Sequence, residues 1–142
     1  MTTVAPAHAA RPTYAAGMSI RVDRHDLAAK LDDFGQGYLL TVSADGGVKA
    51  VTVEPTIVDG LLRVAGPGRG SLTNAGERPA ATVLFPPREH GGYTLLVDGA
   101  ARVESDDVIV DPASAVLHRP AAHADGPGPA GESACENDCT HL

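Results

Sequence analysis

The sequence predicts a small, mainly β domain in which short antiparallel strands build a barrel or sandwich with short helices against it. Three observations carry this prediction. Six short segments are rich in strand-forming residues, tight glycine-containing turns join several of them, and one amphipathic segment has helical spacing. The chain has 142 residues, of which 43% are hydrophobic. This length suffices for one packed core and is too short for two of ordinary size.

Residues 23–34 are the helical segment. Its apolar side chains recur at i, i+4 and i+7 and so share one face, namely Leu27, Leu31 and Phe34. Asp23 is placed to cap the first turn, and Asp26 occupies the acidic position of a capping box. Glycines follow and end the helix. We therefore expect a short helix lying against one end of a sheet.

Strand-like segments begin after this helix. Residues 38–43 and 48–53 flank Asp45-Gly46-Gly47, in which glycine supplies the positive φ that a hairpin turn requires. Residues 57–65 form a third strand, which the pair Asp59-Gly60 would divide into two short pieces. Strands joined by such tight turns form an antiparallel meander, because parallel pairing needs longer connections.

The second half of the chain continues the pattern after a glycine-rich loop at residues 66–70. Residues 71–77 predict one or two helical turns, and further strands are expected at 80–85, 93–103 and 108–110. Gly99 predicts a bulge or a close backbone approach within the long strand. Residues 113–118 predict one helical turn, which Pro120 would end.

The composition divides the chain into three parts. We expect a flexible arm at residues 1–18, the folded domain at 19–120, and a tail at 121–142 in which glycine and proline are frequent. The pattern of strands leaves three architectures open, an OB-like barrel, an SH3-like barrel and a split barrel.

Four stretches between residues 26 and 110 have an order and spacing that narrow this choice. They are the strand 37–43 with its turn, residues 61–65, Asn74 five residues before Pro79, and the Gly-x-Ala-x-Val pattern within 97–103. Together they resemble the flavin-binding split-barrel family, which includes pyridoxamine 5′-phosphate oxidases and their deazaflavin-using relatives. The resemblance implies a six-stranded antiparallel split barrel with short helices.

The resemblance also implies a function. It is that of an oxidoreductase acting on a small organic substrate, with FMN or a deazaflavin coenzyme bound at the interface of a homodimer. In such proteins the cofactor carries the hydride, while the protein binds and orients the substrate. No catalytic side chain is therefore singled out.

The candidate cofactor-binding residues lie in the glycine-rich loop, the helix after it and the second strand. Arg69 would pair with a phosphate, and hydroxyls and backbone amides of the adjoining turn would donate to it. The barrel wall, with Thr41, Thr52 and Val53, would flank the ring. Asn74 could equally be a hydrogen-bonding residue at a helix end. The full candidate set is Arg69, Gly70, Ser71, Thr73, Asn74, Thr52 and Val53.

Two positions depart from the family pattern. Members commonly carry a lysine where this chain has Ser71, and a Pro-His pair where it has Val48-Lys49. The missing lysine favours an alternative function, that of a non-catalytic protein that binds or senses flavin, haem or another planar ligand on the same barrel.

The tail holds a separate candidate site at Cys135, Cys139 and His141. Cysteines four residues apart share one face of a helix, and the histidine adds a third potential ligand for zinc. The same two thiols could act as a reversible dithiol, or could simply be exposed to solvent.

The charge and the apolar runs exclude other classes. A formal net charge of −7 and an aromatic content of 4% argue against a nucleic-acid partner, which needs a basic surface and stacking side chains. No apolar run is long enough to span a bilayer, and the first residues lack the apolar centre of a secretory signal. We therefore expect a cytoplasmic protein without a membrane partner. Its richness in alanine, glycine, proline and valine is typical of GC-rich bacterial genomes.

Overall fold

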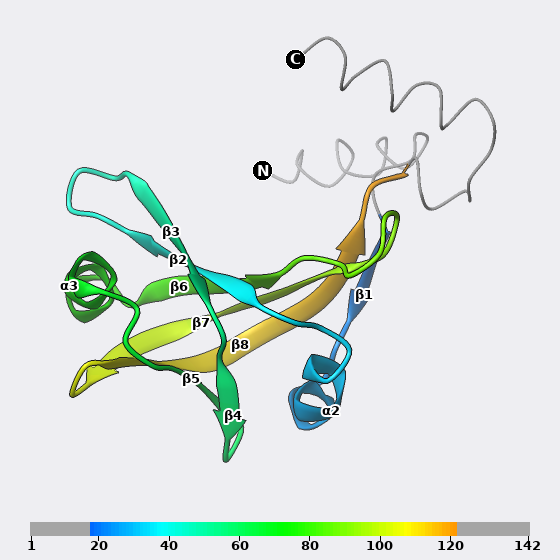
Figure 1. The fold of residues 1–142 in the computed structure, drawn as a ribbon, viewed down its shortest axis with the longest axis horizontal. Helices are drawn as coiled ribbons and strands as arrows, with labels where there is room; N and C mark the ends of the chain where they lie inside the picture. The colour runs from blue at the N-terminus through cyan, green and yellow to red at the C-terminus, as the bar shows by residue number, and fades with distance from the viewer. Residues whose placement is uncertain (1–17, 122–142) are drawn as a thin grey trace, which may run out of the picture. The chain divides into compact units, whose positions relative to one another are not determined.

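The computed structural model describes residues 18–121, and the compact unit Ile20–His118 holds almost all of its elements (Figure 1). In chain order these are β1 (Met18–Arg21), the 3₁₀ helix η2 (Arg24–Asp26), α2 (Leu27–Leu31), β2 (Gly37–Val42), β3 (Val48–Val53), β4 (Thr56–Val58), β5 (Leu61–Val64), α3 (Arg69–Glu77), β6 (Ala80–Phe85), β7 (Thr94–Glu104) and β8 (Asp107–Arg119). Within this part of the chain, no helix has the length and apolar character needed to cross a membrane. The cytoplasmic location stays a prediction.

The strands form one sheet in the order β3-β2-β6-β7-β8-β5-β4, and β1 pairs with β8. The pairs along this order are antiparallel. This mainly β architecture with two short helices confirms the predicted fold class. The sheet has eight strands where six were expected. One addition is the division of residues 57–65 at Asp59 and Gly60, whose φ values of 54° and 79° make the tight turn between β4 and β5. The other is β1, which the sequence left undetected.

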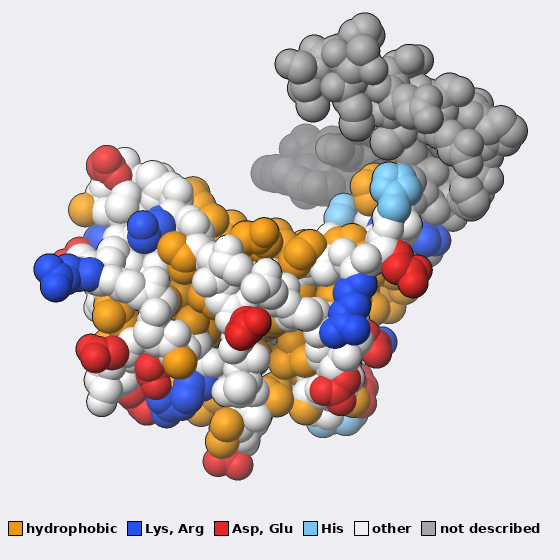
Figure 2. Space-filling model, in the orientation of Figure 1, with side chains coloured by type: hydrophobic (Ala, Val, Ile, Leu, Met, Phe, Trp, Pro, Cys, Tyr) orange, Lys and Arg blue, Asp and Glu red, His pale blue; other side chains and the backbone are white. Residues whose placement is uncertain are grey.

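The two faces of the sheet differ in burial because successive side chains alternate. Leu39, Val83 and Val97 pair across β2, β6 and β7 and are fully buried on the inner face. The neighbouring row of Leu40, Thr82 and Asp98 lies on the outer face. Figure 2 shows hydrophobic side chains over the middle of the described chain, with most charged side chains toward its rim.

The β2–β3 hairpin has the expected turn. Ser43 and Gly47 close it with a backbone N–H to carbonyl hydrogen bond of 2.8 Å, and Gly46 has a φ of 89°. The Asp45 carboxylate accepts hydrogen bonds from the Ser43 hydroxyl and the Gly47 amide, and these bonds lower the pKa of Asp45. The hairpin is therefore held by its own side chains as well as by the ladder.

The last strand, β8, corrects one prediction. Residues 113–118 are not a helical turn, because β8 continues to Arg119 and pairs with β7 from Asp107 to His118 apart from one irregularity. The register shifts between Asp98 and Gly99, and Pro112 lies opposite Gly99 at this irregularity. A bulge tolerates a proline, which lacks the N–H that a regular ladder needs.

The bulge also confirms the expectation for Gly99. A Cβ at this position would lie 2.3 Å from the Asp111 carbonyl oxygen, so the two strand backbones approach more closely than any side chain allows.

The first helix is shorter than predicted. Residues 24–26 form a 3₁₀ turn, the α-helix covers only Leu27–Leu31, and neither Asp23 nor Asp26 makes a side-chain capping bond. The chain leaves the helix through hydrogen bonds of the i to i+3 type, which include Phe34 N–H to the Leu31 carbonyl at 3.0 Å. This tighter winding still brings all three predicted apolar side chains against the core.

Candidate functional site

The first turn of α3 is the centre of the candidate site. Its N-cap is Gly68, with a φ of 105°, and no side chain caps the turn. The first backbone bond inside the helix joins the Leu72 amide to the Gly68 carbonyl at 3.0 Å. The amides that precede Leu72 therefore have no acceptor within the helix, and they carry the positive end of the helix dipole. The first turn contains no acidic residue that would offset this positive end.

A lysine from another element lies against this turn. Lys49 of β3 pairs with Thr41 of β2, and its side chain extends over Gly70. A Cβ at Gly70 would stand 2.9 Å from Lys49 Cε and 3.4 Å from Lys49 Nζ. Arg69 adds a second exposed cation in the same turn. Neither Lys49 nor Arg69 has an ion pair or side-chain hydrogen bond with any residue in the described part of the chain.

Ser71 lies in the same turn and is fully buried. Its Oγ has no hydrogen-bond partner among the described residues. An enclosed hydroxyl without a partner is uncommon in folded proteins and is destabilising by itself. Ser71 is therefore the one buried side chain of this turn whose hydrogen bonding is incomplete among the described residues.

Two hydrogen bonds hold α3 against β2. The Asn74 amide donates to Thr41 Oγ1 at 3.1 Å, and both side chains are buried. At the other end of the helix, Arg78 Nε donates to the Val42 carbonyl at 2.9 Å. Because Thr41 is also the partner of Lys49 in the hairpin, the Asn74 bond fixes the helix beside the strand position that carries the lysine.

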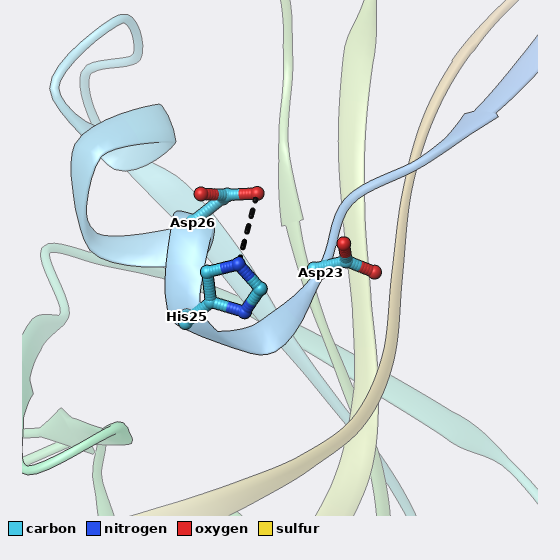
Figure 3. A group of neighbouring side chains, drawn as sticks. All are labelled: Asp23, His25 and Asp26. Carbon is cyan, nitrogen blue, oxygen red and sulfur yellow. Dashed lines mark ion pairs between the residues drawn. The ribbon is translucent and has the colours of Figure 1, made fainter.

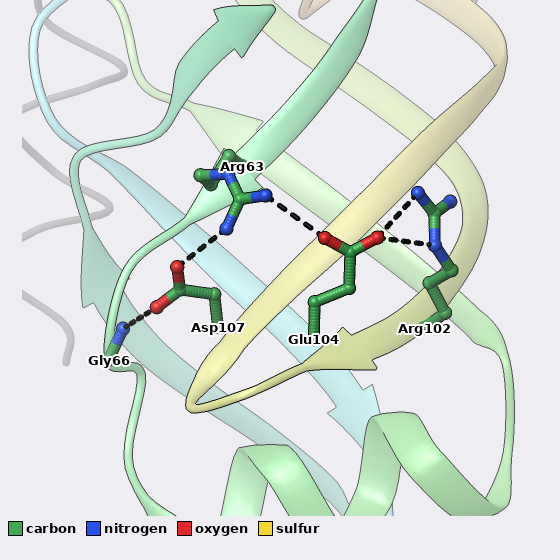
Figure 4. A network of polar contacts seen from close by, with 5 residues as sticks. All are labelled: Arg63, Gly66, Arg102, Glu104 and Asp107. Carbon is green, nitrogen blue, oxygen red and sulfur yellow. Dashed lines mark hydrogen bonds and ion pairs between the residues drawn. The ribbon is translucent and has the colours of Figure 1, made fainter.

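A charged network holds the loop that leads into α3 (Figure 4). Asp107 accepts from the Gly66 amide at 3.2 Å and from Arg63 at 2.7 Å. Glu104 accepts from Arg63 at 3.0 Å and from Arg102 at 2.8 Å. Hydrogen bonds from Arg102 and Arg63 lower the pKa of Glu104, and the bond to Asp107 raises the pKa of Arg63. The β7–β8 turn thereby anchors the chain three residues before the helix starts.

An apolar groove lies on the outer face of the sheet, with a volume of about 370 Å³. We call it the outer groove. Its lining comes from β2, β3, β6 and β7 and consists of Leu40, Thr41, Val42, Val48, Ala80, Ala81, Thr82, Asp98 and Gly99. Asp98 is the single charged side chain of this lining, and it accepts a hydrogen bond of 2.5 Å from the Thr82 hydroxyl. Such a surface can hold a flat apolar group with one polar edge.

The structure groups the residues that the sequence singled out. Arg69, Gly70, Ser71, Thr73 and Asn74 all lie on α3. Thr52 is exposed on β3, while the side chains of Val53 and Thr41 are buried in the interior. The side chains of Val53 and Thr41 therefore face the core, and Thr52 alone of the three wall candidates is exposed.

Sequence reasoning missed Lys49, Asp98 and Asp107 as site residues. The sequence offered one weak indication of Lys49, namely that it is the one lysine, and so the one cation, within the β2–β3 hairpin. The contact with Gly70 joins segments that are distant in sequence, so only the tertiary structure reveals it.

A second group of polar side chains lies at the start of η2 (Figure 3). Asp23, His25 and Asp26 bring potential ligand atoms within 4.8 Å of one another, and all three are exposed. His25 and Asp26 form an ion pair of 3.7 Å when the histidine is protonated. Exposed acids are common at helix starts, so we assign no metal site here. The tail candidates Cys135, Cys139 and His141 lie outside the described residues.

No family model matches the chain. Two uncharacterized mycobacterial proteins do, one from Mycobacterium tuberculosis and one from Mycobacterium bovis. Each is 36% identical over 135 residues, which cover 84% of this chain and 93% of the relative. The chain belongs to the same family as these two proteins.

Several solved structures resemble the fold of this chain. A conserved hypothetical protein from M. tuberculosis matches with a TM-score of 0.56 and 11% identity, over 77% of this chain and 91% of the other. A protein from Mesorhizobium loti, described as FAD-binding, matches with a TM-score of 0.55 and 14% identity, over 72% and 97%. A Mycobacterium smegmatis protein, also described as FAD-binding, matches with a TM-score of 0.52 and 18% identity, over 72% and 98%. The fold is a split barrel, which confirms the fold class predicted from the sequence.

Proposed function

We propose that this split-barrel protein binds FMN or a deazaflavin coenzyme and acts as an oxidoreductase on a small organic substrate. One observation supports this proposal above the others. The first turn of α3 presents Arg69 and amides without an acceptor in the helix, Lys49 of β3 lies over it, and no described acid pairs with either cation. Together these groups are the donor set that a phosphate requires. The description of two proteins of the same fold as FAD-binding points in the same direction.

The residues present fit a cofactor that combines a phosphate with a flat ring. The α3 turn would hold the phosphate through Arg69 and the backbone amides, and Ser71 would gain a partner for its orphaned hydroxyl if the turn adjusted around the anion. The outer groove offers an apolar wall with one carboxylate, Asp98. When bound, such a cofactor supplies the hydride chemistry, and the chain's own part is to bind it and to orient the substrate.

A homodimer belongs to the same proposal. On β2 and β3 the outer face presents Tyr38, Leu40, Val42, Val48 and Ala50. Tyr38 is 40% exposed and Val48 is 68% exposed. A contiguous apolar face of this kind favours an interaction surface over free contact with water. A second copy covering it would place both outer grooves at the interface. Light scattering on the purified protein should then give twice the mass of the 14.5 kDa chain.

The alternative is a non-catalytic protein that binds or senses a flavin or haem on the same barrel. The observation that favours it is Ser71, which stands where members of the split-barrel family commonly carry a lysine. Turnover with any pair of reductant and acceptor would exclude this alternative.

The deciding experiment is an absorbance titration of the purified protein with FMN and then with the deazaflavin coenzyme. We expect saturable micromolar binding of one of them, weakened at least tenfold in Arg69→Ala because a charge-assisted phosphate contact is lost. Arg21→Ala is the matched control, since Arg21 is also an exposed arginine but lies on β1. Binding of neither compound at high micromolar concentration would refute the proposal. An equal loss of affinity in Arg69→Ala and Arg21→Ala would show that the phosphate does not bind at α3.

A further inference from the structure

We propose that Lys49, held over Gly70, is a second cation of the phosphate site and makes it select phosphorylated over unphosphorylated flavins. This inference rests on the proposed function and adds to it a residue from a different element. The observation that supports it is that Lys49 of β3 lies across the first turn of α3 and contacts that turn at Gly70.

The backbone places the lysine there. Lys49 and Thr41 are paired in the hairpin, so their side chains share the inner face of the sheet. Thr41 accepts the buried hydrogen bond from Asn74, which fixes α3 next to this pair. The Lys49 stem consequently runs over Gly70, with Cδ 3.3 Å and Cε 2.9 Å from the position of a Cβ. Any side chain at residue 70 would displace the lysine from the turn.

The charges show that this placement suits a ligand. Lys49, Arg69 and the positive end of the α3 dipole are of like sign, and like charges held together repel. No carboxylate among the described residues pairs with either side chain. Elsewhere in the described chain Arg24, Lys30, Arg63, Arg78 and Arg102 each pair with an acid, whereas Arg21 and Arg88 form no ion pair with a described residue. An oxyanion bound at the turn would remove the repulsion.

The buried hydroxyl of Ser71 is a second observation at the same turn. It belongs to the residue after Gly70, it is fully enclosed, and it lacks a hydrogen-bond partner in the described part of the chain. Hydroxyls, amides and two cations around one turn match a phosphate ester, which carries several acceptor oxygens and up to two charges. A ligand without a phosphate would leave these donors unused.

An ordinary role for Lys49 would be to protect an edge strand, since β3 ends the sheet and lysine discourages edge-to-edge pairing. That role requires no glycine at residue 70 and no open helix end. The two explanations predict different behaviour of Gly70, and this difference gives the test.

The experiment compares FMN with riboflavin, which differ only in the phosphate, by fluorescence titration of five proteins. These are the wild type, Lys49→Ala, Gly70→Ala, the double variant and Gly76→Ala. Gly76 is the matched control because it lies on the same helix and its Cβ would meet Val103 at an ordinary 3.7 Å. Alanine favours a helix over glycine, so neither glycine variant should lose stability. Thermal melts of all five proteins verify this.

We expect Lys49→Ala to weaken FMN binding about tenfold and to leave riboflavin binding unchanged. Gly70→Ala should give a similar loss, and the double variant should lose no more than Lys49→Ala alone, because both changes remove the same contact. Gly76→Ala should bind as the wild type does.

An unchanged ratio of FMN to riboflavin affinity in Lys49→Ala would overturn the inference while the proposed function stood. Additive losses in the double variant would overturn the link between Lys49 and Gly70. A wild type that binds neither flavin would refute the proposed function, and pyrophosphate titration followed by phosphorus NMR would then test the anion site alone. Binding of pyrophosphate that depends on Lys49 would support the cation assignment, and binding that does not would overturn it.

Discussion

The two helices of the domain begin in opposite ways. The η2–α2 segment starts at Asp23 and Asp26, so its positive end is surrounded by carboxylates. The α3 helix starts at a glycine, has no acid in its first turn, and has Arg69 and Lys49 there, neither of which pairs with an acid among residues 18–121. One helix start is neutralised by its own sequence, and the other stays open. The difference teaches that the dipole alone does not define a site, because what matters is whether the chain has already supplied the counter-charge.

The largest effect is expected from disturbing the pairing of β7 with β8, because β7 packs against α3. Gly99→Ala places a Cβ 2.3 Å from the Asp111 carbonyl oxygen, within a rigid pair of strands. We expect a loss of about 3 kcal/mol in the free energy of unfolding, because the backbone has to shift to relieve the overlap. Urea denaturation measures it. Gly76→Ala should change stability by less than about 1 kcal/mol. Equal midpoints for the two variants would contradict the close approach.

Giving α3 the acidic start of α2 should abolish the difference between the helices. Arg69→Glu replaces a cation with a carboxylate at the first helical position. We expect FMN affinity to fall about a hundredfold, or about 2.7 kcal/mol. The variant should unfold at an equal or higher temperature, because an acid near a helix start is favourable. Binding titration and thermal melting test both effects. A variant that keeps its FMN affinity would show that the open start of α3 has no part in binding.

Loosening α3 from β2 should weaken both the fold and the site. Asn74→Ala leaves the buried Thr41 hydroxyl without its partner. We expect a loss of about 2 kcal/mol in the free energy of unfolding, measured with urea. Thr41→Val should cost a similar amount, and the double variant should cost less than the sum of the two. Full additivity would show that the two side chains do not support each other.

The loop before α3 should respond to acid. Hydrogen bonds from Arg102 and Arg63 lower the pKa of Glu104 below the ordinary 4.5, so its stabilising contribution is present above that pH and is lost as the pH falls through the lowered value. We expect Glu104→Gln to flatten the fall in stability below about pH 4.5. Melting temperatures from pH 7 to pH 3 check this. A variant that loses stability in acid as steeply as the wild type would exclude the contribution of Glu104.

The smallest effect is expected at the other helix. Asp23→Ala and Asp26→Ala remove acids that make no side-chain capping bond, so each should change stability by less than about 0.5 kcal/mol. Both should leave FMN affinity unchanged. Calorimetry and the same titration provide the measurements. A clear loss of flavin binding in either variant would reverse the comparison between the two helices.

Local signals carried most of the fold prediction. The turn at Asp45 to Gly47 predicted the hairpin, and Gly99 predicted the bulge, because each requires a backbone geometry that few residues adopt. The prediction failed at residues 113–118, which were read as one helical turn ended by Pro120. Pairing with β7 overrode that local preference, since the bulge gave Pro112 a place without a ladder bond.

The sequence by itself determined that this protein is a small barrel with a glycine-rich helix start, and it named Arg69 and the residues that follow it. Only the tertiary structure decided which other groups face that turn. Hairpin register put Lys49 beside Thr41, and the packing of α3 on β2 brought Gly70 under the lysine. The physical reason is that side-chain spacing along a chain records local geometry, whereas a site formed by two distant segments depends on how their faces pack.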